Sequence, residues 1–154
     1  MSSTTFGTLG VPAPLVEILA SQEITVPTPI QAGTLPAPLA GRDVLGRGRT
    51  GSGKTMAFVL PLLTRLSRST TQRQSRRPRA LILAPTRELA TQIEDALTPL
   101  AAPLGLTSRT VFGGVGQNPQ VAALRRGVDV IVACPGRLED LIGQGHVSLD
   151  AIEV

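Results

Sequence analysis

Several residue types that often fix a protein's class are scarce in this sequence. The 154 residues include no tryptophan, no tyrosine and a single cysteine, Cys134, which excludes an internal disulfide. The first residues show neither the basic start nor the apolar run of a secretory signal. Because 13 prolines and 16 glycines interrupt the apolar segments, no run approaches the ~18 residues of a membrane span. We therefore expect a cytoplasmic protein with no membrane partner.

Lysine is also nearly absent, since Lys54 is the single lysine beside 14 arginines. A net charge of +4 and an isoelectric point near 10.9 favour a polyanionic partner and permit nucleic acid without requiring it. The length and the 42% hydrophobic content suit one α/β core and are too small for two ordinary domains. Arginine serves wherever a positive charge suffices, so the lysine at position 54 calls for a separate explanation.

The spacing of apolar residues predicts helices followed by alternating strands and helices. Helices are expected at residues 14–22, 28–39, 54–66, 87–100, 118–126 and 136–142, and strands at residues 43–46, 80–84, 108–112 and 128–133. Short apolar strands that alternate with helices predict a parallel, doubly wound α/β sheet. In such a sheet the loops that follow the strands share one functional edge.

One long connection in this pattern is strongly basic. Residues 67–79 read SRSTTQRQSRRPR, with five arginines and no large apolar side chain. This composition is typical of a solvated connecting loop.

The loop after the first expected strand carries a phosphate-binding pattern. Residues 48–55 read GRTGSGKT, which fits G-x-x-x-x-G-K-[ST] between a strand and a helix. Gly51 and Gly53 let the backbone wrap closely around phosphate oxygens, and the helix start adds free N–H groups and positive potential. Lys54 supplies a compact ammonium where a planar guanidinium would not fit, and Thr55 would offer a hydroxyl to Mg²⁺. The alternative reading is a glycine-rich turn that caps a helix.

Five motifs then follow one another in a particular order. They are PTPIQ (residues 27–31), TGSGKT (50–55), APTRELA (84–90), Gly113-Gly114 and CPGR (134–137). Together they resemble the DEAD-box family of ATP-dependent RNA helicases, and the resemblance covers essentially the whole chain. It implies a RecA-like P-loop NTPase fold, incomplete at its C-terminus. Residues 1–40 would form a helical segment with the Q motif, and residues 41–154 a partial ATP-binding domain.

The resemblance also implies an ATP site. Gln31 would read the adenine edge with its amide, which both donates and accepts hydrogen bonds. Phe6 would support this segment from upstream, or simply pack in the core. Ile24 stands where the family usually has an aromatic residue, and Glu23 where glycine is common, which would weaken adenine binding. The implied ATP-binding set is Phe6, Ile24, Pro29, Gln31, Arg49, Thr50, Gly51, Ser52, Gly53, Lys54 and Thr55. Its catalytic members would be Lys54 and Thr55, with Thr55 as the Mg²⁺ ligand.

The remaining motifs resemble the family's RNA-facing surface. The implied RNA-binding residues are Pro85, Thr86, Arg87, Gly113, Gly114, Pro135, Gly136 and Arg137. Helix starts and glycines suit contacts to phosphates that do not depend on base sequence. Taken singly, PTRELA and CPGR can also be read as ordinary helix starts. Cys134 replaces the threonine usual in CPGR and so removes a hydroxyl.

The sequence contains no D-E-A-D motif and no second RecA-like domain, both of which the family uses for hydrolysis. We therefore expect a helicase by family whose 154 residues bind ATP, Mg²⁺ and RNA without turnover. A marginal stability is also expected, because a missing neighbouring strand would leave apolar surface uncovered. The alternatives are a non-catalytic nucleotide- or RNA-binding module and an unrelated P-loop kinase or transporter ATPase.

Overall fold

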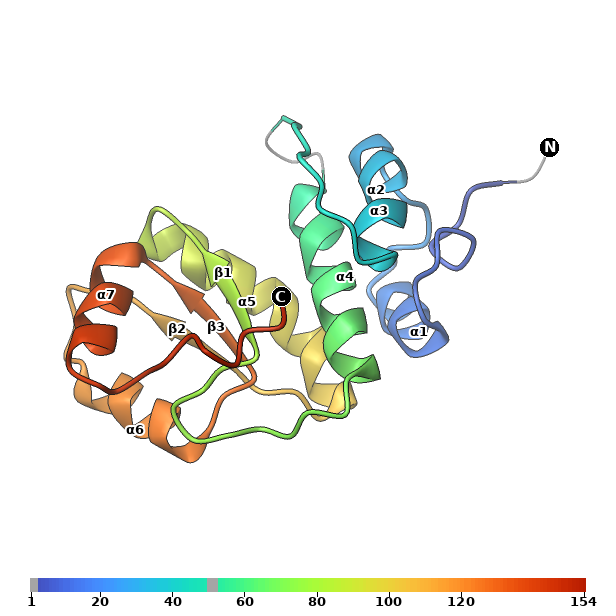
Figure 1. The fold of residues 1–154 in the computed structure, drawn as a ribbon. Coiled ribbons are helices and arrows are strands. Elements are labelled where there is room, and N and C mark those ends of the chain that lie inside the picture. Colours follow the sequence, from blue (N-terminus) through green and yellow to red (C-terminus); the bar gives the residue numbers. More distant parts are fainter. Residues whose placement is uncertain (1–2, 50–52) are drawn as a thin grey trace. The chain divides into compact units, whose positions relative to one another are not determined.

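The computed structural model describes residues 3–49 and 53–154, which divide into two compact units, Met1–Arg68 and Ser69–Val154. Figure 1 shows the helical first unit and the sheet of the second. The expected ligand contacts of Thr50, Gly51 and Ser52 lie outside the described residues.

Four helices make up the described part of the first unit. They are α1 (Ala13–Ser21), α2 (Pro29–Thr34), α3 (Pro36–Leu39) and α4 (Lys54–Arg68). The buried side chains of Leu15 and Leu19 lie one turn apart on α1. The expected single helix over residues 28–39 is divided at Pro36, because proline has no N–H to continue the helical hydrogen bonds.

The turn after α1 explains one departure from the family pattern. Glu23 has a φ of 62°, in the left-handed region that favours glycine. The N–H groups of Glu23 and Ile24 donate to the carbonyls of Ala20 and Leu19, as at the C-terminus of a helix that ends in a left-handed residue. Glu23 therefore occupies a position whose backbone suits the glycine common in the family.

The strand expected at residues 43–46 was a wrong prediction. The first unit contains no strand among its described residues, and the side chains of Val44 and Leu45 are 49% and 86% exposed. A strand forms only when a neighbouring strand satisfies its backbone N–H and C=O groups, and residues 43–46 make no such ladder here. An apolar run between polar segments signals the propensity for a strand but not its partner.

The second unit contains a parallel sheet, which confirms the predicted α/β class. Strands β1 (Ala80–Leu83), β3 (Val130–Ala133) and β2 (Ser108–Val111) lie in the order β1-β3-β2, with Ala80 and Ser108 both opposite Val130. Helix α5 (Arg87–Ala101) and the short 3₁₀ helix η1 (Ala102–Leu104) connect β1 to β2. Helix α6 (Asn118–Arg126) connects β2 to β3, and α7 (Pro135–Gly143) follows β3.

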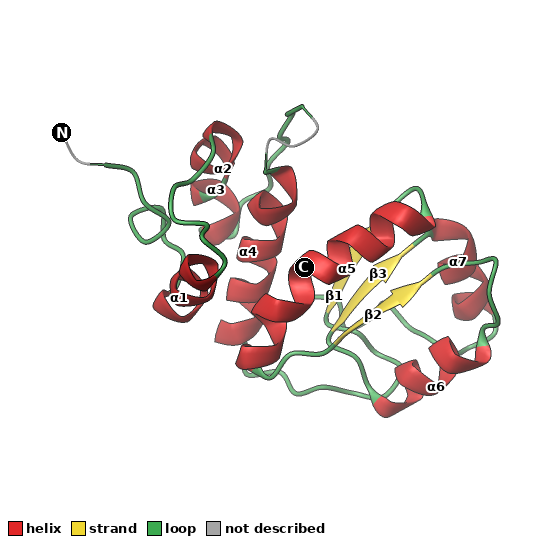
Figure 2. Ribbon diagram, turned by 180° about the vertical axis from the view of Figure 1, so that it is seen from behind, coloured by secondary structure: helices red, strands yellow, loops and turns green. Residues whose placement is uncertain are grey.

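The helices cover both faces of this sheet (Figure 2). The chain passes from β1 over β3 to β2 and then turns back to β3, so right-handed crossovers put α5 and α6 on opposite faces. Ile131 and Ala133 pack with Leu124 of α6 and Leu141 of α7 in one buried cluster. Because side chains alternate along a strand, Val130 and Val132 face the other layer, and β3 is buried throughout.

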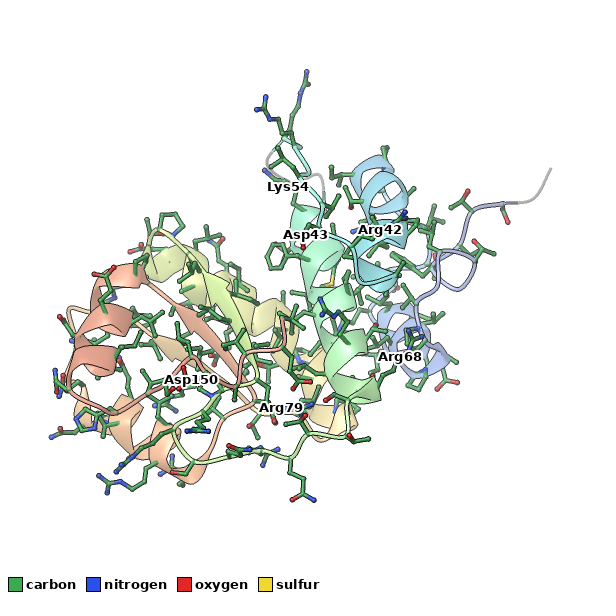
Figure 3. The ribbon with its side chains drawn as sticks, viewed as in Figure 1. Arg42, Asp43, Lys54, Arg68, Arg79 and Asp150 are labelled. Atoms are coloured by element: carbon green, nitrogen blue, oxygen red, sulfur yellow. The ribbon has the colours of Figure 1, made fainter. Side chains whose placement is uncertain are left out.

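An ionic cluster ties the basic connection to the sheet and corrects the expectation of a simple solvated loop. Asp129, just before β3, is 1% exposed, and its Oδ2 accepts from Nε of Arg73 at 3.0 Å and from the Thr107 N–H at 2.9 Å. Arg79 is 5% exposed and lies 3.4 Å from Asp129 Oδ1 and 2.8 Å from Glu153 Oε2. Figure 3 labels Arg79 at this end of the sheet. Two of the loop arginines are thus anchors, because a buried carboxylate needs positive partners.

A carboxylate on α5 makes the stability depend on pH. Burial raises the pKa of Glu94, while Arg109 and a hydrogen bond from the backbone of Thr110 oppose this and Asp95 adds to it. One of its carboxylate oxygens is buried and has no hydrogen-bond partner among the described residues. A raised pKa means that the folded state holds the proton more tightly than the unfolded chain. Stability is therefore lost as the pH rises from the unfolded pKa through the folded one.

Replacing Glu94 with glutamine is accordingly expected to stabilise the protein at pH 7 and to have little effect at pH 3, where the carboxyl is protonated in both states. Thermal melts at the two pH values measure the difference. Glu139→Gln, an exposed carboxylate on α7, is the matched control. Equal effects of Glu94→Gln at both pH values would contradict the assigned pKa direction.

Among the described residues, no helix is both long enough and apolar enough to cross a membrane.

Candidate functional site

In the first unit, Gln31 joins the start of α2 to the residue before α4. Thr28 caps α2: its hydroxyl accepts from the Gln31 N–H, while the Gln31 Oε1 accepts from the Thr28 N–H at 2.9 Å. The Gln31 Nε2 donates to the Gly53 carbonyl at 3.0 Å. Gln31 is only 3% exposed, so its amide holds the end of the glycine loop in place. Recognition of adenine by Gln31 stays a prediction. Because the amide oxygen and one amide N–H already bond to Thr28 and Gly53, adenine would have to use the second N–H or a rearranged amide.

Gly53 has no room for a side chain. Its φ is 88°, and a Cβ there would lie 2.5 Å from the Gln31 Nε2 and 2.9 Å from the Thr28 Oγ1. Lys54 is the first residue of α4 and is exposed, and the side chain of Thr55 is half-buried one position later. Figure 3 shows Lys54 at this end of the helix. A helix N-terminus beside a lysine is suited to bind phosphate oxygens.

The other residues expected at the nucleotide differ in exposure. Phe6 is 2% exposed, and its carbonyl accepts from the N–H of Val11, so it packs inside the first unit. Ile24 is half-buried, and Pro29 is the exposed first residue of α2. Arg49 is exposed in the loop before the undescribed residues. The structure thus brings Gln31 and Gly53 together and leaves the ligand contacts of the other residues as predictions.

In the second unit, the three predicted RNA motifs follow the carboxyl ends of three adjacent parallel strands. Residues 85–87 follow β1, residues 113–114 follow β2, and residues 135–137 follow β3. Parallel strands end at the same edge of a sheet, so this placement gathers the motifs as the sequence predicted. Two of them begin helices: Thr86 caps α5 by accepting from the Leu89 N–H at 3.2 Å, and Pro135 is the first residue of α7.

The first arginine of this edge is stacked on an aromatic ring. The guanidinium of Arg87 lies 5.0 Å from the centroid of Phe112. Gly114 has a φ of 80°, and a Cβ at this position would lie 2.7 Å from Arg87 Nη1. The glycine therefore leaves space for the guanidinium above the ring, a cation–π arrangement.

The second arginine is held by hydrogen bonds to the same turn. Arg137 Nη2 donates to the Val115 carbonyl at 2.9 Å, and Nη1 donates to Gln120 Oε1 at 3.2 Å. Gln120 is 5% exposed, and its Nε2 donates to the Phe112 carbonyl at 2.9 Å. Neither Arg87 nor Arg137 forms an ion pair within the described chain, so both retain donors for an anion.

Cys134 precedes α7 in an extended conformation and makes no capping hydrogen bond with its side chain. The thiol leaves the first N–H groups of α7 without the partner that a threonine hydroxyl would provide. The expected loss of a hydroxyl at this position is therefore visible in the geometry.

Two residues of the arrangement were missed by sequence reasoning. The sequence marks Phe112 only as the last residue of an expected strand, and Gln120 only as part of an expected helix. Gly113 and Gly114 next to Phe112 could have suggested the ring, because glycines often leave room for a neighbouring group. No local signal marked Gln120, whose role depends on the return of α6 across the sheet.

The motifs and the sheet define a helicase domain, and comparison with known proteins agrees. The DEAD/DEAH box helicase family model matches residues 28–154, so the chain belongs to this family. The ATP-dependent RNA helicase RhlB of Sodalis glossinidius is 46% identical over 143 residues, which cover 92% of this chain and 34% of that protein. RhlB of Xanthomonas oryzae pv. oryzae is 46% identical over 157 residues, covering 100% of this chain and 27% of RhlB.

A solved structure shows the same fold. The RNA helicase Prp28 of Chaetomium thermophilum, bound to ADP, superposes on this chain with a TM-score of 0.87 at 41% sequence identity. The match covers 99% of this chain and 37% of the Prp28 chain. The chain thus spans about a third or less of the RhlB proteins and slightly more of Prp28.

Proposed function

We propose that the chain is the ATP- and RNA-binding portion of an ATP-dependent RNA helicase, which couples ATP hydrolysis to local opening of RNA duplexes. The observation that carries this proposal is the convergence of three strand-end motifs on one turn. There Arg87 and Arg137 are fixed by Phe112, Gln120 and Val115 but have no acidic partner in the described chain. Fixed arginines with free donors suit the phosphates of a nucleic acid. The RhlB and Prp28 relatives are RNA helicases, which supports RNA as the ligand.

The first unit supports a nucleotide with Mg²⁺. Two observations support a nucleotide: Gly53, directly before the start of α4, has no room for a side chain, and the related Prp28 is bound to ADP. Lys54 would neutralise phosphate oxygens, and Gln31 would keep Gly53 in place while reading adenine. Thr55 would contribute one hydroxyl to Mg²⁺, which normally keeps waters and phosphate oxygens among its ligands. The bound nucleotide supplies a phosphoanhydride bond to be hydrolysed.

In the second unit, residues of the helix starts and the glycine turn would hold the RNA backbone. The N–H groups of Gly136 and Arg137 at the start of α7 would donate to phosphate, as would free N–H groups at the start of α5. Gly113 and Gly114 would allow close approach of the backbone. Because these contacts involve phosphates, we expect binding that is independent of base sequence and weakened by salt.

The proposal is tested with Lys54→Ala and the charge-preserving Lys54→Arg. We expect both variants of the 154-residue chain to bind a fluorescent ATP analogue at least ~10-fold more weakly, since a guanidinium does not replace the compact ammonium. A longer protein that contains this chain, the D-E-A-D motif and the second RecA-like domain should show RNA-stimulated ATPase activity that Lys54→Ala abolishes. The 154 residues alone should bind without turnover.

The outcomes separate the alternatives. Nucleotide and RNA binding without RNA-stimulated turnover in the longer protein would indicate the non-catalytic binding module. ATP turnover that is indifferent to RNA would indicate a member of this family whose ATPase activity is not coupled to RNA, and would contradict the proposed activity. Unchanged nucleotide binding in both Lys54 variants would contradict the phosphate site itself.

The ring under Arg87 gives a finer test of the RNA site. Phe112→Leu should weaken binding of a single-stranded RNA by roughly 2- to 5-fold, the loss expected for an exposed cation–π contact of about 0.5–1 kcal/mol. Phe112→Tyr, which retains a ring, should bind as the parent does. Fluorescence anisotropy with a labelled oligouridylate measures both, and equal affinities for the leucine and tyrosine variants would remove Phe112 from the site.

A further inference from the structure

A second group of arginines lies at the opposite edge of the sheet from the proposed RNA site. The connection from residue 69 to residue 79 leads to the amino end of β1, and α6 ends shortly before the amino end of β3. Arg76 and Arg77 are in this connection, and Arg125 and Arg126 are the last residues of α6. In Figures 1 and 2 the connection passes beside α6. We call these four residues the amino-edge arginines.

Backbone hydrogen bonds fix the position of Arg76 within the group. The Arg76 N–H donates to the Leu124 carbonyl at 2.8 Å, which places Arg76 against the end of α6 beside Arg125. On its other side, the Arg76 carbonyl accepts from the Ser148 N–H at 2.8 Å. The segment is therefore built into the unit and is more than a solvated link.

The conformation of Arg76 sets it apart from an ordinary loop residue. Its φ is 62°, in the left-handed region where glycine or asparagine would be less strained. Arg76 is the third residue of a tight turn in which the Arg77 N–H donates to the Gln74 carbonyl at 3.5 Å, a position where glycine is common. Arg76→Gly therefore removes the charge without disturbing the turn.

Few carboxylates are available to neutralise the amino-edge arginines. The nearby carboxylates of Asp129 and Glu153 are engaged by Arg73 and Arg79. All four amino-edge arginines are exposed, and none forms an ion pair with another described residue. Asp150 is the one acidic residue that shares a depression with Arg76 and Arg77. Exposed arginines that gather at one edge of a unit favour a polyanionic partner.

A depression adjoins two of these arginines. Its volume is about 630 Å³, and Arg76, Arg77 and Asp150 line it together with apolar groups of Ile142, Val147 and Leu149. This size falls within the range of sites for small ligands, roughly 300–1,000 Å³. Its lining combines apolar side chains, which suit a planar group, with guanidinium groups, which suit phosphate.

We propose that the amino-edge arginines and this depression form a second surface for single-stranded RNA. The phosphates would pair with the arginines, and a base would enter the depression and stack on a guanidinium plane, as bases do on arginine where aromatic side chains are lacking. RNA is favoured over an acidic peptide because the opposite edge of the same unit already presents fixed arginines to a nucleic acid. In this respect the inference rests on the proposed function.

The test uses binding of a fluorescein-labelled 20-nucleotide oligouridylate to the 154-residue chain. Arg125→Gln/Arg126→Gln is expected to weaken binding by roughly 3- to 10-fold and to lower the salt dependence by about 0.7 for each phosphate that the variant no longer neutralises. The matched control is Arg42→Gln/Arg47→Gln, which removes two exposed arginines of the first unit. Its RNA affinity should change less than about 2-fold, the effect we expect from losing two positive charges that do not contact the RNA.

Arg76→Gly separates a binding role from a structural one. Glycine relieves the left-handed backbone and keeps both backbone hydrogen bonds, so the melting temperature should not fall, whereas RNA affinity should. If Arg76→Gly and the Arg125/Arg126 variant bind RNA as the control does, the second surface is excluded. Loss of polyglutamate binding in the same variants, with RNA binding unchanged, would instead assign the surface to an acidic peptide.

A further variant, Arg87→Gln, distinguishes this inference from the proposed function. Weaker RNA binding by Arg87→Gln with unchanged binding by the amino-edge variants overturns only the second surface. Absence of RNA binding by the parent chain overturns both.

Discussion

Asp129→Ala is expected to unfold much of the Ser69–Val154 unit at moderate temperature. Removal of the carboxylate leaves the guanidinium of Arg79, which is 5% exposed, with Glu153 as its remaining carboxylate partner in the cluster, and it deprives the Thr107 N–H of its acceptor. Breaking a buried charge pair costs about 3–5 kcal/mol when the partner is left unpaired. Because Arg79 keeps Glu153, we expect the loss to lie at the lower end of this range. For a domain of this size, each kcal/mol lowers the melting temperature by roughly 4–8 °C.

Thermal denaturation followed by circular dichroism measures this effect. The control is Asp140→Ala, which removes an exposed carboxylate on α7. Because Asp140 forms no ion pair with a described residue, this variant should leave the melting temperature almost unchanged. Asp129→Asn keeps an acceptor of the same shape and should fall between the two. If Asp129→Ala has the same melting temperature as Asp140→Ala, the ionic cluster does not stabilise the unit.

Gly53→Ala is expected to have the largest effect on nucleotide binding after loss of Lys54. The φ of 88° is strained for alanine, and the new Cβ would lie 2.5 Å from the Gln31 Nε2 that bonds to the Gly53 carbonyl. Either the loop or the glutamine must move. With strain of about 1–3 kcal/mol, we expect affinity to fall roughly 5- to 150-fold.

Titration with a fluorescent ATP analogue measures the loss. Gly33→Ala is the matched control, because a Cβ on Gly33 in α2 would meet no atom within 4 Å. It should bind the nucleotide as the parent does and melt at the same or a higher temperature, since alanine favours a helix. Equal affinity of Gly53→Ala and Gly33→Ala would show that the turn at Gly53 is not part of the phosphate site.

The regular elements of the second unit could be predicted closely because their signals are local. Helix α6 matches the expected residues 118–126, and β1, β2 and β3 start or end within about two residues of the expected positions. Apolar strands bounded by glycine and polar residues can be recognised from the local sequence. The start of α5 can also be recognised, because Thr86 is a typical N-cap residue. The order of the strands, β1-β3-β2, was not predicted.

The failures have a common cause, which is dependence on partners distant in sequence. Residues 43–46 have the composition of a strand, yet a strand exists only where another strand accepts its hydrogen bonds. Residues 67–79 have the composition of a solvated loop, yet Arg79 is buried because Asp129 lies beside it, 50 positions further along the chain. The composition of a segment indicates whether it can be exposed to solvent. It does not indicate which charged residue, distant in sequence, packs against it in the fold.

By itself, the sequence determined the family, the parallel α/β class and the gathering of three motifs at the carboxyl ends of strands. It could do so because glycines, helix starts and apolar periods act over a few residues. Tertiary structure alone decided the positions of the arginines. Arg87 lies over Phe112, Arg137 is held by Gln120, Arg79 is buried on Asp129, and Arg76 is kept on the surface at the end of α6. All four residues are arginines. Only the neighbours that folding brings to each one decide whether its guanidinium anchors the core or remains available to a ligand.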